Sequence, residues 1–313
     1  MRYALVLVAF CATAHAQYPD KPIRLVVGFS AGGPTDLPAR FIADRLGATL
    51  GQRIVVENRP GAAGVIGSKS VIASPADGAT LLYTPSSLSL SVAINKTPPY
   101  DLVKDFSPIV NVAISPYALV VNASVPAKSL QEFTAYAKAN PGKLSYGSAG
   151  VGSASHLAAE LLKSKTGIDM VHVPNKGMNP ALIDLMGGQV QVLFASVPGL
   201  TSEKTDRARP IAMAELKRSA LMPELPTMSE SGLPGFAVGN WAGLLGPPGL
   251  DAAIVKKLHD EVLAILATDE MKARIKTLGF DVIASTPEEF AKQLQEDVAR
   301  WGPVAKVVSE EKK

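Results

Sequence analysis

Short apolar runs alternate with longer amphipathic stretches along almost the whole chain. The first apolar run, Ile23 to Val27, is rich in β-branched residues; glycines follow it, and then apolar residues at helical spacing from Leu37 to Leu46. The same alternation predicts strands at 53–58 and 80–83 with a helix at 66–73 between them. This βαβαβ order predicts a mostly parallel sheet flanked by helices, with ligands beyond the carboxyl ends of its strands.

A second α/β unit begins near residue 118. Its expected strands are 118–121, 143–147, 170–173 and 190–194, and its expected helices are 129–140, 156–165 and 180–186. Ser129 and Glu132 have the spacing of a helix-capping pair. After residue 235 the pattern predicts a strand-like run at 241–245 and helices at 251–268, 269–278 and 287–301, the last ending at Gly302-Pro303.

We expect these last elements to return to the first unit, so that two crossing segments form a hinge. The predicted fold class is α/β with two lobes, each a mostly parallel sheet flanked by helices, and a ligand cleft between them. Lobe 1 is expected to comprise residues 17–117 plus 235–313, and lobe 2 residues 118–234.

The first 16 residues have the pattern of a secretory signal peptide. Arg2 precedes an apolar run, and Ala14-His15-Ala16 forms a cleavage site, so an exported protein is predicted. The only cysteine, Cys11, lies within this segment, where lipid attachment is an alternative; the mature chain would then contain no disulfide. No later stretch has 18 uninterrupted apolar residues, so no helical membrane anchor is expected.

Charge gives no indication of a nucleic-acid or anionic-membrane partner. The chain has 31 Lys and Arg against 28 Asp and Glu, a net charge of +3, and the basic residues are scattered.

The loop after the first strand is the first candidate site. Gly32 and Gly33 allow close approach to the backbone, and Thr35 or Asp36 is expected to cap the next helix, so free amides at the helix start favour an anionic group such as a carboxylate. Three alternatives remain: a nucleophile elbow, because Gly28-Phe29-Ser30-Ala31-Gly32 fits G-x-S-x-G; a phosphate loop, which lacks its lysine; and a βα turn without a ligand.

A second loop repeats this logic. Ser148, Ala149, Gly150, Gly152, Ser153 and Ser155 follow a strand and open a helix. The pattern nearly matches a dinucleotide fingerprint, but its acidic partner would be Asp169, at the start of the next strand rather than its end, so no nucleotide cofactor is predicted. Hydroxyls and helix amides suit a carboxylate; Ser153 or Ser155 serving only as a helix cap is the simpler alternative.

No catalytic or metal centre is predicted. His156 and His172 are interpreted as structural, and no cluster has the spacing of a zinc site. Asp36 beside the first loop suits an acid or base, yet helix capping explains it as well.

The chain resembles a known family along nearly its whole length after the signal segment: the periplasmic Bug proteins, the TctC-like substrate-binding components of tripartite tricarboxylate transporters. The motifs that carry the resemblance are Tyr18 to Arg24, the glycine loop ending at Thr35-Asp36, Val55 to Ala62, Pro75 to Gly78, Pro141 to Leu144, Ser155 to Leu157, His172 to Pro174, Gly187 to Val190, Pro226 to Gly232 and Thr286 to Phe290.

This resemblance implies a non-enzymatic binding protein of the Venus-flytrap type, which closes on a small organic, dicarboxylic or aromatic acid and presents it to a membrane permease or a sensor protein. A monomer without a cofactor is expected. The implied ligand-binding residues are Phe29, Ser30, Ala31, Gly32, Gly33, Thr35, Asp36, Ser86, Ser87, Ser148, Ala149, Gly150, Gly152, Ser153, Ser155, Asn175, Ala195 and Ser196.

The sequence departs from the family pattern at three of these neighbourhoods. Many relatives have tyrosine in place of Asn175 and an acidic or amide residue near Ala195, and the first loop usually has glycine in place of Pro34. Loss of the tyrosine ring would enlarge the pocket, and the Asn175 amide can donate or accept a hydrogen bond. These differences bear on the identity of the ligand rather than on the fold.

Overall fold

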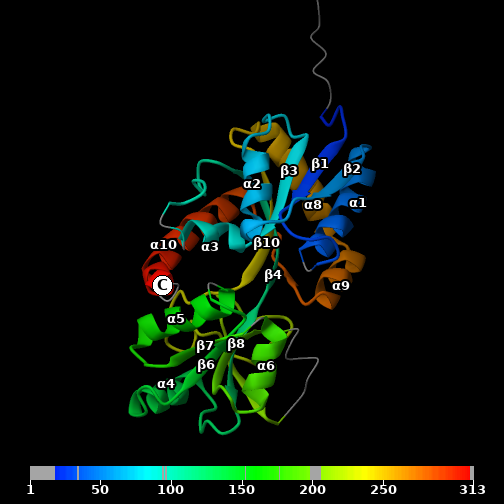
Figure 1. Ribbon diagram of the computed structural model, residues 1–313. Coiled ribbons are helices and arrows are strands. Elements are labelled where there is room, and N and C mark those ends of the chain that lie inside the picture. The colour runs from blue at the N-terminus through cyan, green and yellow to red at the C-terminus, as the bar shows by residue number, and fades with distance from the viewer. Residues whose placement is uncertain are drawn as a thin grey trace, which may run out of the picture.

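The protein has two lobes, each built on one β-sheet (Figure 1). The computed structural model describes residues 18–33, 35–93, 95, 97–151, 153–175, 177–197 and 206–310, with side chains through Trp301. The expected signal segment 1–16, Pro34 and Gly152 lie outside these residues. The structure confirms the predicted two-lobed α/β architecture.

The first sheet has six strands in the order β11-β4-β10-β3-β1-β2. Their bounds are β1 Ile23–Val27, β2 Ile54–Asn58, β3 Thr80–Pro85, β4 Ser107–Ser115, β10 Asn240–Gly246 and β11 Asp281–Val282. Strands β2, β1 and β3 are parallel, whereas β10 and β11 pair antiparallel with their neighbours.

Helices cover both faces of this sheet because the buried strand residues alternate. Leu25 and Val27 contact the cluster formed with α1 and α8, while Val26 contacts the cluster that includes α2, α3 and α10. The helices of this lobe are α1 Asp36–Leu50, α2 Val65–Ile72, α3 Ser87–Ala93, α8 Ala252–Ala267, α9 Asp269–Thr277 and α10 Pro287–Glu310, with a short 3₁₀ turn at Ala62–Gly64.

The second sheet has five strands in the order β7-β6-β8-β5-β9. The strands are β5 Tyr117–Asn122, β6 Ser145–Ser148, β7 Val171–Pro174, β8 Val192–Ser196 and β9 Ala208–Met213, and the helices are α4 Leu130–Ala139, α5 Ala154–Thr166 and α6 Met178–Met186. Helices α4 and α5 pack on the face that carries Leu119 and Phe194, and α6 packs on the face that carries Val120.

Both sheets are therefore mixed rather than mostly parallel. Strands β5 and β10 are the first strands after the chain passes between the sheets, from β4 into β5 and from β9 into β10, and they run antiparallel to the βαβ strands of their sheets. Strand β11, at the edge of the first sheet, also pairs antiparallel, with β4. A strand that enters a lobe from the other lobe arrives from the opposite end, which makes it antiparallel to the βαβ strands. The exact lobe limits given above remain a prediction.

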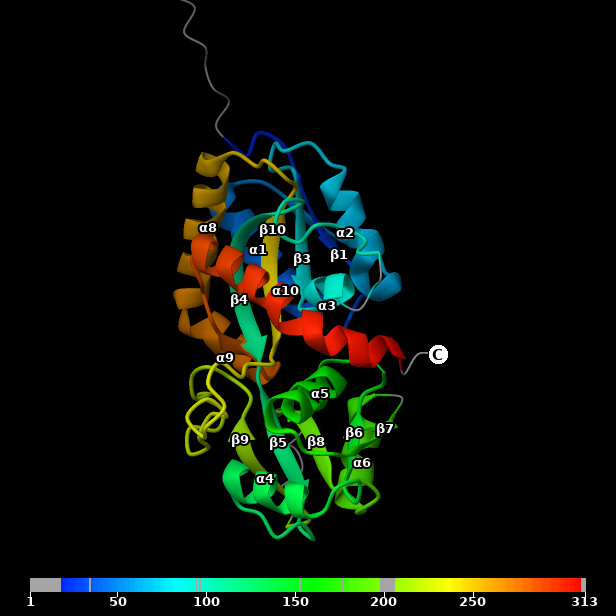
Figure 2. The same ribbon diagram turned by 90° about the vertical axis from the view of Figure 1, so that its left-hand side faces the viewer.

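The last helix does not end at Gly302-Pro303 but continues to Glu310. A proline within a helix kinks it without having to end it, and α10 is packed along its length against α3 and then α5 of the other lobe (Figure 2). Trp301, near this crossing, belongs to the buried cluster of the second lobe.

Candidate functional site

The first glycine loop leaves the end of β1 and rests on the start of α2. A Cβ atom added to Gly28 would lie 2.7 Å from the Cα of Gly64, and one added to Gly67 would lie 2.9 Å from the Cα of Gly28. These three glycines let two backbone segments touch. Gly32 adopts a φ of +76°, which turns the chain toward α1.

A buried carboxylate holds this loop in place. Asp36 Oδ2 accepts hydrogen bonds from the Gly32 amide at 2.8 Å and from Arg40 Nε at 2.7 Å, and its Oδ1 accepts one from Asn58 Nδ2 at 2.8 Å. Asn58 Nδ2 also donates to the Phe29 carbonyl at 2.9 Å. Burial would raise the pKa of Asp36, but the hydrogen bonds from Arg40, Gly32 and Asn58 together hold this pKa below its usual range.

The prediction that Thr35 or Asp36 caps the helix after this loop is wrong. Thr35 has helical backbone angles and its side chain caps nothing, and Asp36 reaches back onto the loop instead of onto the first helical turn. The loop tip at Ser30, Ala31 and Gly32 is exposed, and within the described residues no hydrogen bond occupies the amides of Ser30 and Ala31. These amides are available to an anion.

The second loop leaves the end of β6 and opens α5. Ser153 caps this helix by accepting a hydrogen bond from the His156 amide at 3.4 Å, as the sequence allowed. Ser155 and Ser148 are buried beneath the loop: Ser155 Oγ accepts from the Ala149 amide at 2.9 Å, and Ser148 Oγ accepts from the Gly150 amide at 3.1 Å. Their hydroxyls therefore shape the loop, and the first amides of α5 are left for an anion.

Two other predicted residues carry buried polar atoms that lack a partner within the described residues. They are Ser87 Oγ, at the start of α3 in the first lobe, and Asn175 Nδ2, just after β7 in the second. Unpaired buried polar atoms are rare in folded proteins and often mark the place of a ligand or water.

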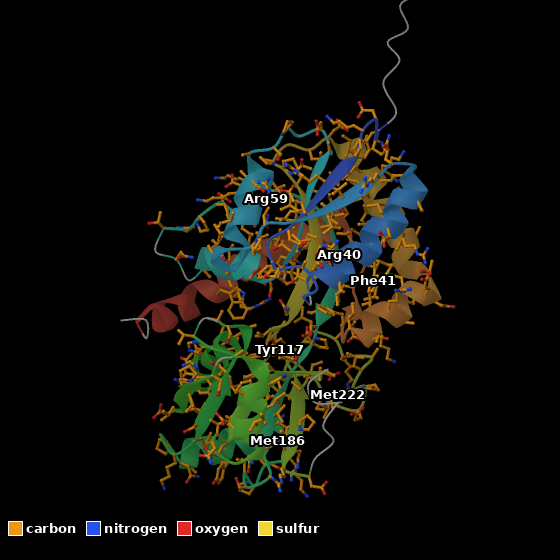
Figure 3. All side chains as sticks on the ribbon, turned by 45° about the vertical axis from the view of Figure 1, so that its right-hand side comes forward. Arg40, Phe41, Arg59, Tyr117, Met186 and Met222 are labelled. Carbon is orange, nitrogen blue, oxygen red and sulfur yellow. The ribbon has the colours of Figure 1, made fainter. Side chains whose placement is uncertain are left out.

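The remaining predicted residues lie at the strand ends nearest the hinge. Ser86 donates to Asn240 Oδ1 at 2.9 Å, which ties β3 to the start of β10. Ala195 is fully buried, and Ser196 is half-buried opposite Tyr117 in the β5–β8 pairing. Figure 3 shows Arg40 and Phe41 on the upper lobe and Tyr117 at the end of the lower lobe that faces it.

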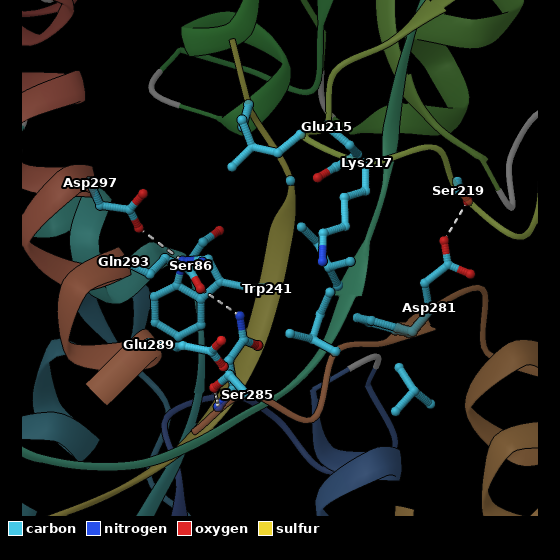
Figure 4. A pocket seen from close by; sticks show the side chains of 18 of the residues that line it. Ser86, Glu215, Lys217, Ser219, Trp241, Asp281, Ser285, Glu289, Gln293 and Asp297 are labelled. Atoms are coloured by element: carbon cyan, nitrogen blue, oxygen red, sulfur yellow. Dashed lines mark hydrogen bonds between the residues drawn. The ribbon is translucent and has the colours of Figure 1, made fainter. Parts of the chain in front are cut away.

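A cavity of about 860 Å³ lies toward the β11 edge of the six-stranded sheet, whereas the first loop lies toward the β1–β2 edge. Ser86 is the predicted site residue that lines this cavity. Its wall also includes Glu215, Lys217, Ser219, Trp241, Asp281 and Asp297 (Figure 4). Ser219 donates a hydrogen bond to Asp281 Oδ2, which joins the segment after β9 to β11 of the other lobe.

In the described part of the chain, Glu215 is one of two buried acids that line this cavity, the other being Asp297, and sequence reasoning singled out neither. Glu215 Oε1 lacks a hydrogen-bond partner within the described residues and would lie 2.6 Å from a Cβ on Gly239. Burial, with a smaller contribution from Asp281, raises the pKa of Glu215 to about 8, against the opposing effects of Arg300 and the Tyr117 amide. Glu215 is thus neutral over much of the physiological pH range.

A nucleophile elbow at Ser30 finds no support in the geometry. Within the described residues, no hydrogen bond joins Ser30 to a histidine, as a nucleophile elbow would require. The same residues contain no group of three or more His, Cys, Asp or Glu placed to hold a metal ion. Among the helices described, none is both long and apolar enough to cross a bilayer.

Comparison with known proteins shows to which family this chain is related. The model of the tripartite tricarboxylate transporter family receptor, TctC, matches residues 38–309. BugT of Bordetella pertussis is 34% identical over 292 residues, which cover 92% of this chain and 90% of BugT.

Three solved structures share the fold over nearly the whole chain. An unliganded TctC solute-binding protein from Polaromonas has a TM-score of 0.85 at 28% identity, covering 92% of this chain and 99% of its own. R. palustris Rpa4515 with adipate has a TM-score of 0.71 at 34% identity, covering 93% of this chain and 98% of its own. MatC of Rhodopseudomonas palustris with bound malate has 0.69 at 33%, covering 92% and 100%. The chain belongs to the TctC family of tripartite tricarboxylate transporter receptors, which includes the Bug proteins.

Proposed function

We propose that this protein captures a small dicarboxylate between its two lobes and presents it, in the periplasm, to a tripartite tricarboxylate-type permease. The observation that carries the proposal is the pair of strand-end loops, one in each lobe, that offer amides without a hydrogen-bond partner among the described residues. Each loop is held from beneath by buried side chains, so its amides are oriented before a ligand arrives, which lowers the ordering cost of binding.

The relatives support the ligand class. One binds adipate and another binds malate, two dicarboxylates of different length. A dicarboxylate has one anionic group for each loop. In place of the tyrosine expected from the family pattern, Asn175 provides a buried donor that has no partner among the described residues, which suits a polar group between the two carboxylates or an ordered water.

The lobe arrangement supports an open, unliganded state. Of these three, the unliganded relative has the highest TM-score, 0.85, although the adipate-bound and malate-bound relatives are more similar in sequence and score 0.71 and 0.69. All three cover the chain to a similar extent, and we infer that a different angle between otherwise similar lobes underlies this order. Ligand capture would then close the lobes about β4–β5 and β9–β10.

The test is a thermal-shift and calorimetric screen of residues 17–313 against adipate, malate and other mono- and dicarboxylates. Binding at about 100 times Kd adds roughly 2.7 kcal/mol of apparent stability. Asn175→Ala is expected to weaken the best dicarboxylate about tenfold. The matched control is Asn140→Ala, because Asn140 only caps the end of α4 by donating to the Tyr136 carbonyl. A protein that binds no carboxylate after removal of any retained ligand would contradict the proposal.

A further inference from the structure

Three aromatic rings lie beneath the second glycine loop. His172 of β7 stacks on Tyr146 of β6, with ring centroids 4.8 Å apart and planes 12° apart, and on His156 of α5, with values of 3.9 Å and 15°. Contacts with two other rings fix the orientation of the His172 imidazole.

This orientation places His172 against the loop. His172 Nε2 lies 2.7 Å from Ser148 Oγ, and the same oxygen accepts the hydrogen bond from the Gly150 amide. Ser148 is fully buried. Gly150 has a φ of +123°, and a Cβ there would lie 3.2 Å from the Asn175 carbonyl, so this position favours glycine. The Ser148 hydroxyl therefore connects the imidazole to the loop backbone.

The number of hydrogens on the Ser148 hydroxyl decides whether Ser148 or His172 is the donor in this hydrogen bond. The Ser148 hydroxyl has one hydrogen and already accepts from Gly150, so it is satisfied when its hydrogen is donated to a neutral His172 through Nε2. If His172 were protonated, Nε2 would donate as well, and the hydroxyl hydrogen would lose its acceptor in a buried position. Such an unpaired group is unfavourable, so the loop geometry fits the neutral ring.

We propose that His172 is a positioning residue for ligand capture: by accepting from Ser148 it holds the Gly150 amide beneath the loop and leaves the start of α5 open to a carboxylate. The ligand part of this inference rests on the proposed function; the loop part stands on the contacts alone. His172 itself touches no ligand in this scheme.

Other ionisable groups lie on the elements packed around these rings. On the Tyr146 side, Glu160 Oε1 accepts from Tyr146 Oη at 2.6 Å and from Lys163 Nζ at 2.7 Å, and Lys163 Nζ lies 5.7 Å from the centre of the Tyr146 ring. Glu160 and Lys163 thus form an ion pair. His156 is the other titratable ring in contact, and two stacked imidazolium rings would repel each other.

The first test needs no ligand. Amide hydrogen exchange is measured at Gly150 and Ala149 in the wild type, His172→Phe and His172→Gln. Phenylalanine keeps a flat ring for stacking and removes the acceptor; glutamine restores an acceptor near the Nε2 position without a titrating ring. Ala149 is the internal control, because Ser155 and not His172 holds its amide.

In His172→Phe we expect Gly150 to exchange at least about tenfold faster while Ala149 is unchanged, and in His172→Gln we expect Gly150 to recover. Unchanged Gly150 exchange in His172→Phe, or equal acceleration of both amides, would overturn the proposal.

The second test uses adipate and malate as probes. Wherever the wild type binds one of them, His172→Phe should weaken it about tenfold and His172→Gln by less than about threefold. Equal losses in both variants would count against a positioning role. A wild type that binds neither probe, with the exchange pattern as expected, would place the error in the proposed function and not in the role of His172.

Discussion

Replacement of Asp36 should damage the first loop more than its position at the surface end of a helix suggests. The carboxylate is fully buried and accepts three hydrogen bonds, from Gly32, Arg40 and Asn58. Asp36→Ala leaves the Gly32 amide and one N–H of the Asn58 side chain without their acceptor, whereas the Arg40 side chain, 44% exposed, can turn to water.

The expected loss of stability follows from these three hydrogen bonds. Removing one partner of a buried charge pair costs about 3–5 kcal/mol, and the partial exposure of Arg40 places Asp36→Ala near the lower limit, at about 3 kcal/mol. For domains of 150–250 residues this corresponds to a fall in Tm of about 6–12 °C. Asp36→Asn keeps one acceptor and should cost less.

The assay is thermal unfolding of the two variants beside Asp260→Asn, a control carboxylate that is exposed and pairs with Lys256 one turn away. The control should change stability by no more than about 0.5 kcal/mol. Because the pKa of Asp36 is lowered in the folded state, its contribution is present above the pKa of the unfolded chain, near 4, and is lost as the pH falls through the folded value. If Asp36→Ala lowered the stability at pH 7 by no more than Asp260→Asn does, the proposal that Asp36 holds the first loop in place would be refuted.

Two further predictions concern the hinge and the loop base. The folded protein keeps a proton on Glu215, whose pKa is raised to about 8, while the unfolded chain releases it above about pH 4.3. The free energy of unfolding should therefore fall from pH 5 to pH 8, by at most about 1.4 kcal/mol per pH unit from this group. Glu215→Gln should flatten the curve of Tm against pH. An unchanged slope would show that Glu215 is ionised in the fold. Gly28→Ala should cost about 1–3 kcal/mol in denaturant unfolding, because its Cβ would lie 2.7 Å from backbone at Gly64; a neutral result would mean that α2 moves away freely.

Most elements could be predicted because their apolar periodicity is a local property. The strand expected at 53–58 is β2, and the helix expected at 129–140 is α4, with Ser129 accepting from the Glu132 amide as the capping pattern requires. Strand β4 was not predicted: its partners β10 and β11 are supplied by residues more than a hundred positions later. Mixed pairing is a consequence of chain crossing, which local patterns do not contain.

The candidate loops could be predicted for the same reason, since glycines and hydroxyls between a strand and a helix are adjacent in sequence. Their supports could not. Asn58 reaches the first loop from β2, and His172 reaches the second from β7. Glu215 is buried only because the hinge segments converge on it. The sequence does give one usable signal, which is that each of these residues lies at or near the end of a strand.

The most direct test of the central claim measures the distance between the lobes. Without residues 1–16 the chain has no cysteine, so Lys69→Cys on α2 and Ile183→Cys on α6, both exposed, give one spin-label pair with one label in each lobe. Figure 1 shows α2 and α6 in different lobes. Pulsed electron paramagnetic resonance would then compare the apo protein with protein saturated by the dicarboxylate that calorimetry identifies. The account predicts a shift of the distance distribution to shorter values. An unchanged distribution at full saturation would contradict capture between the lobes.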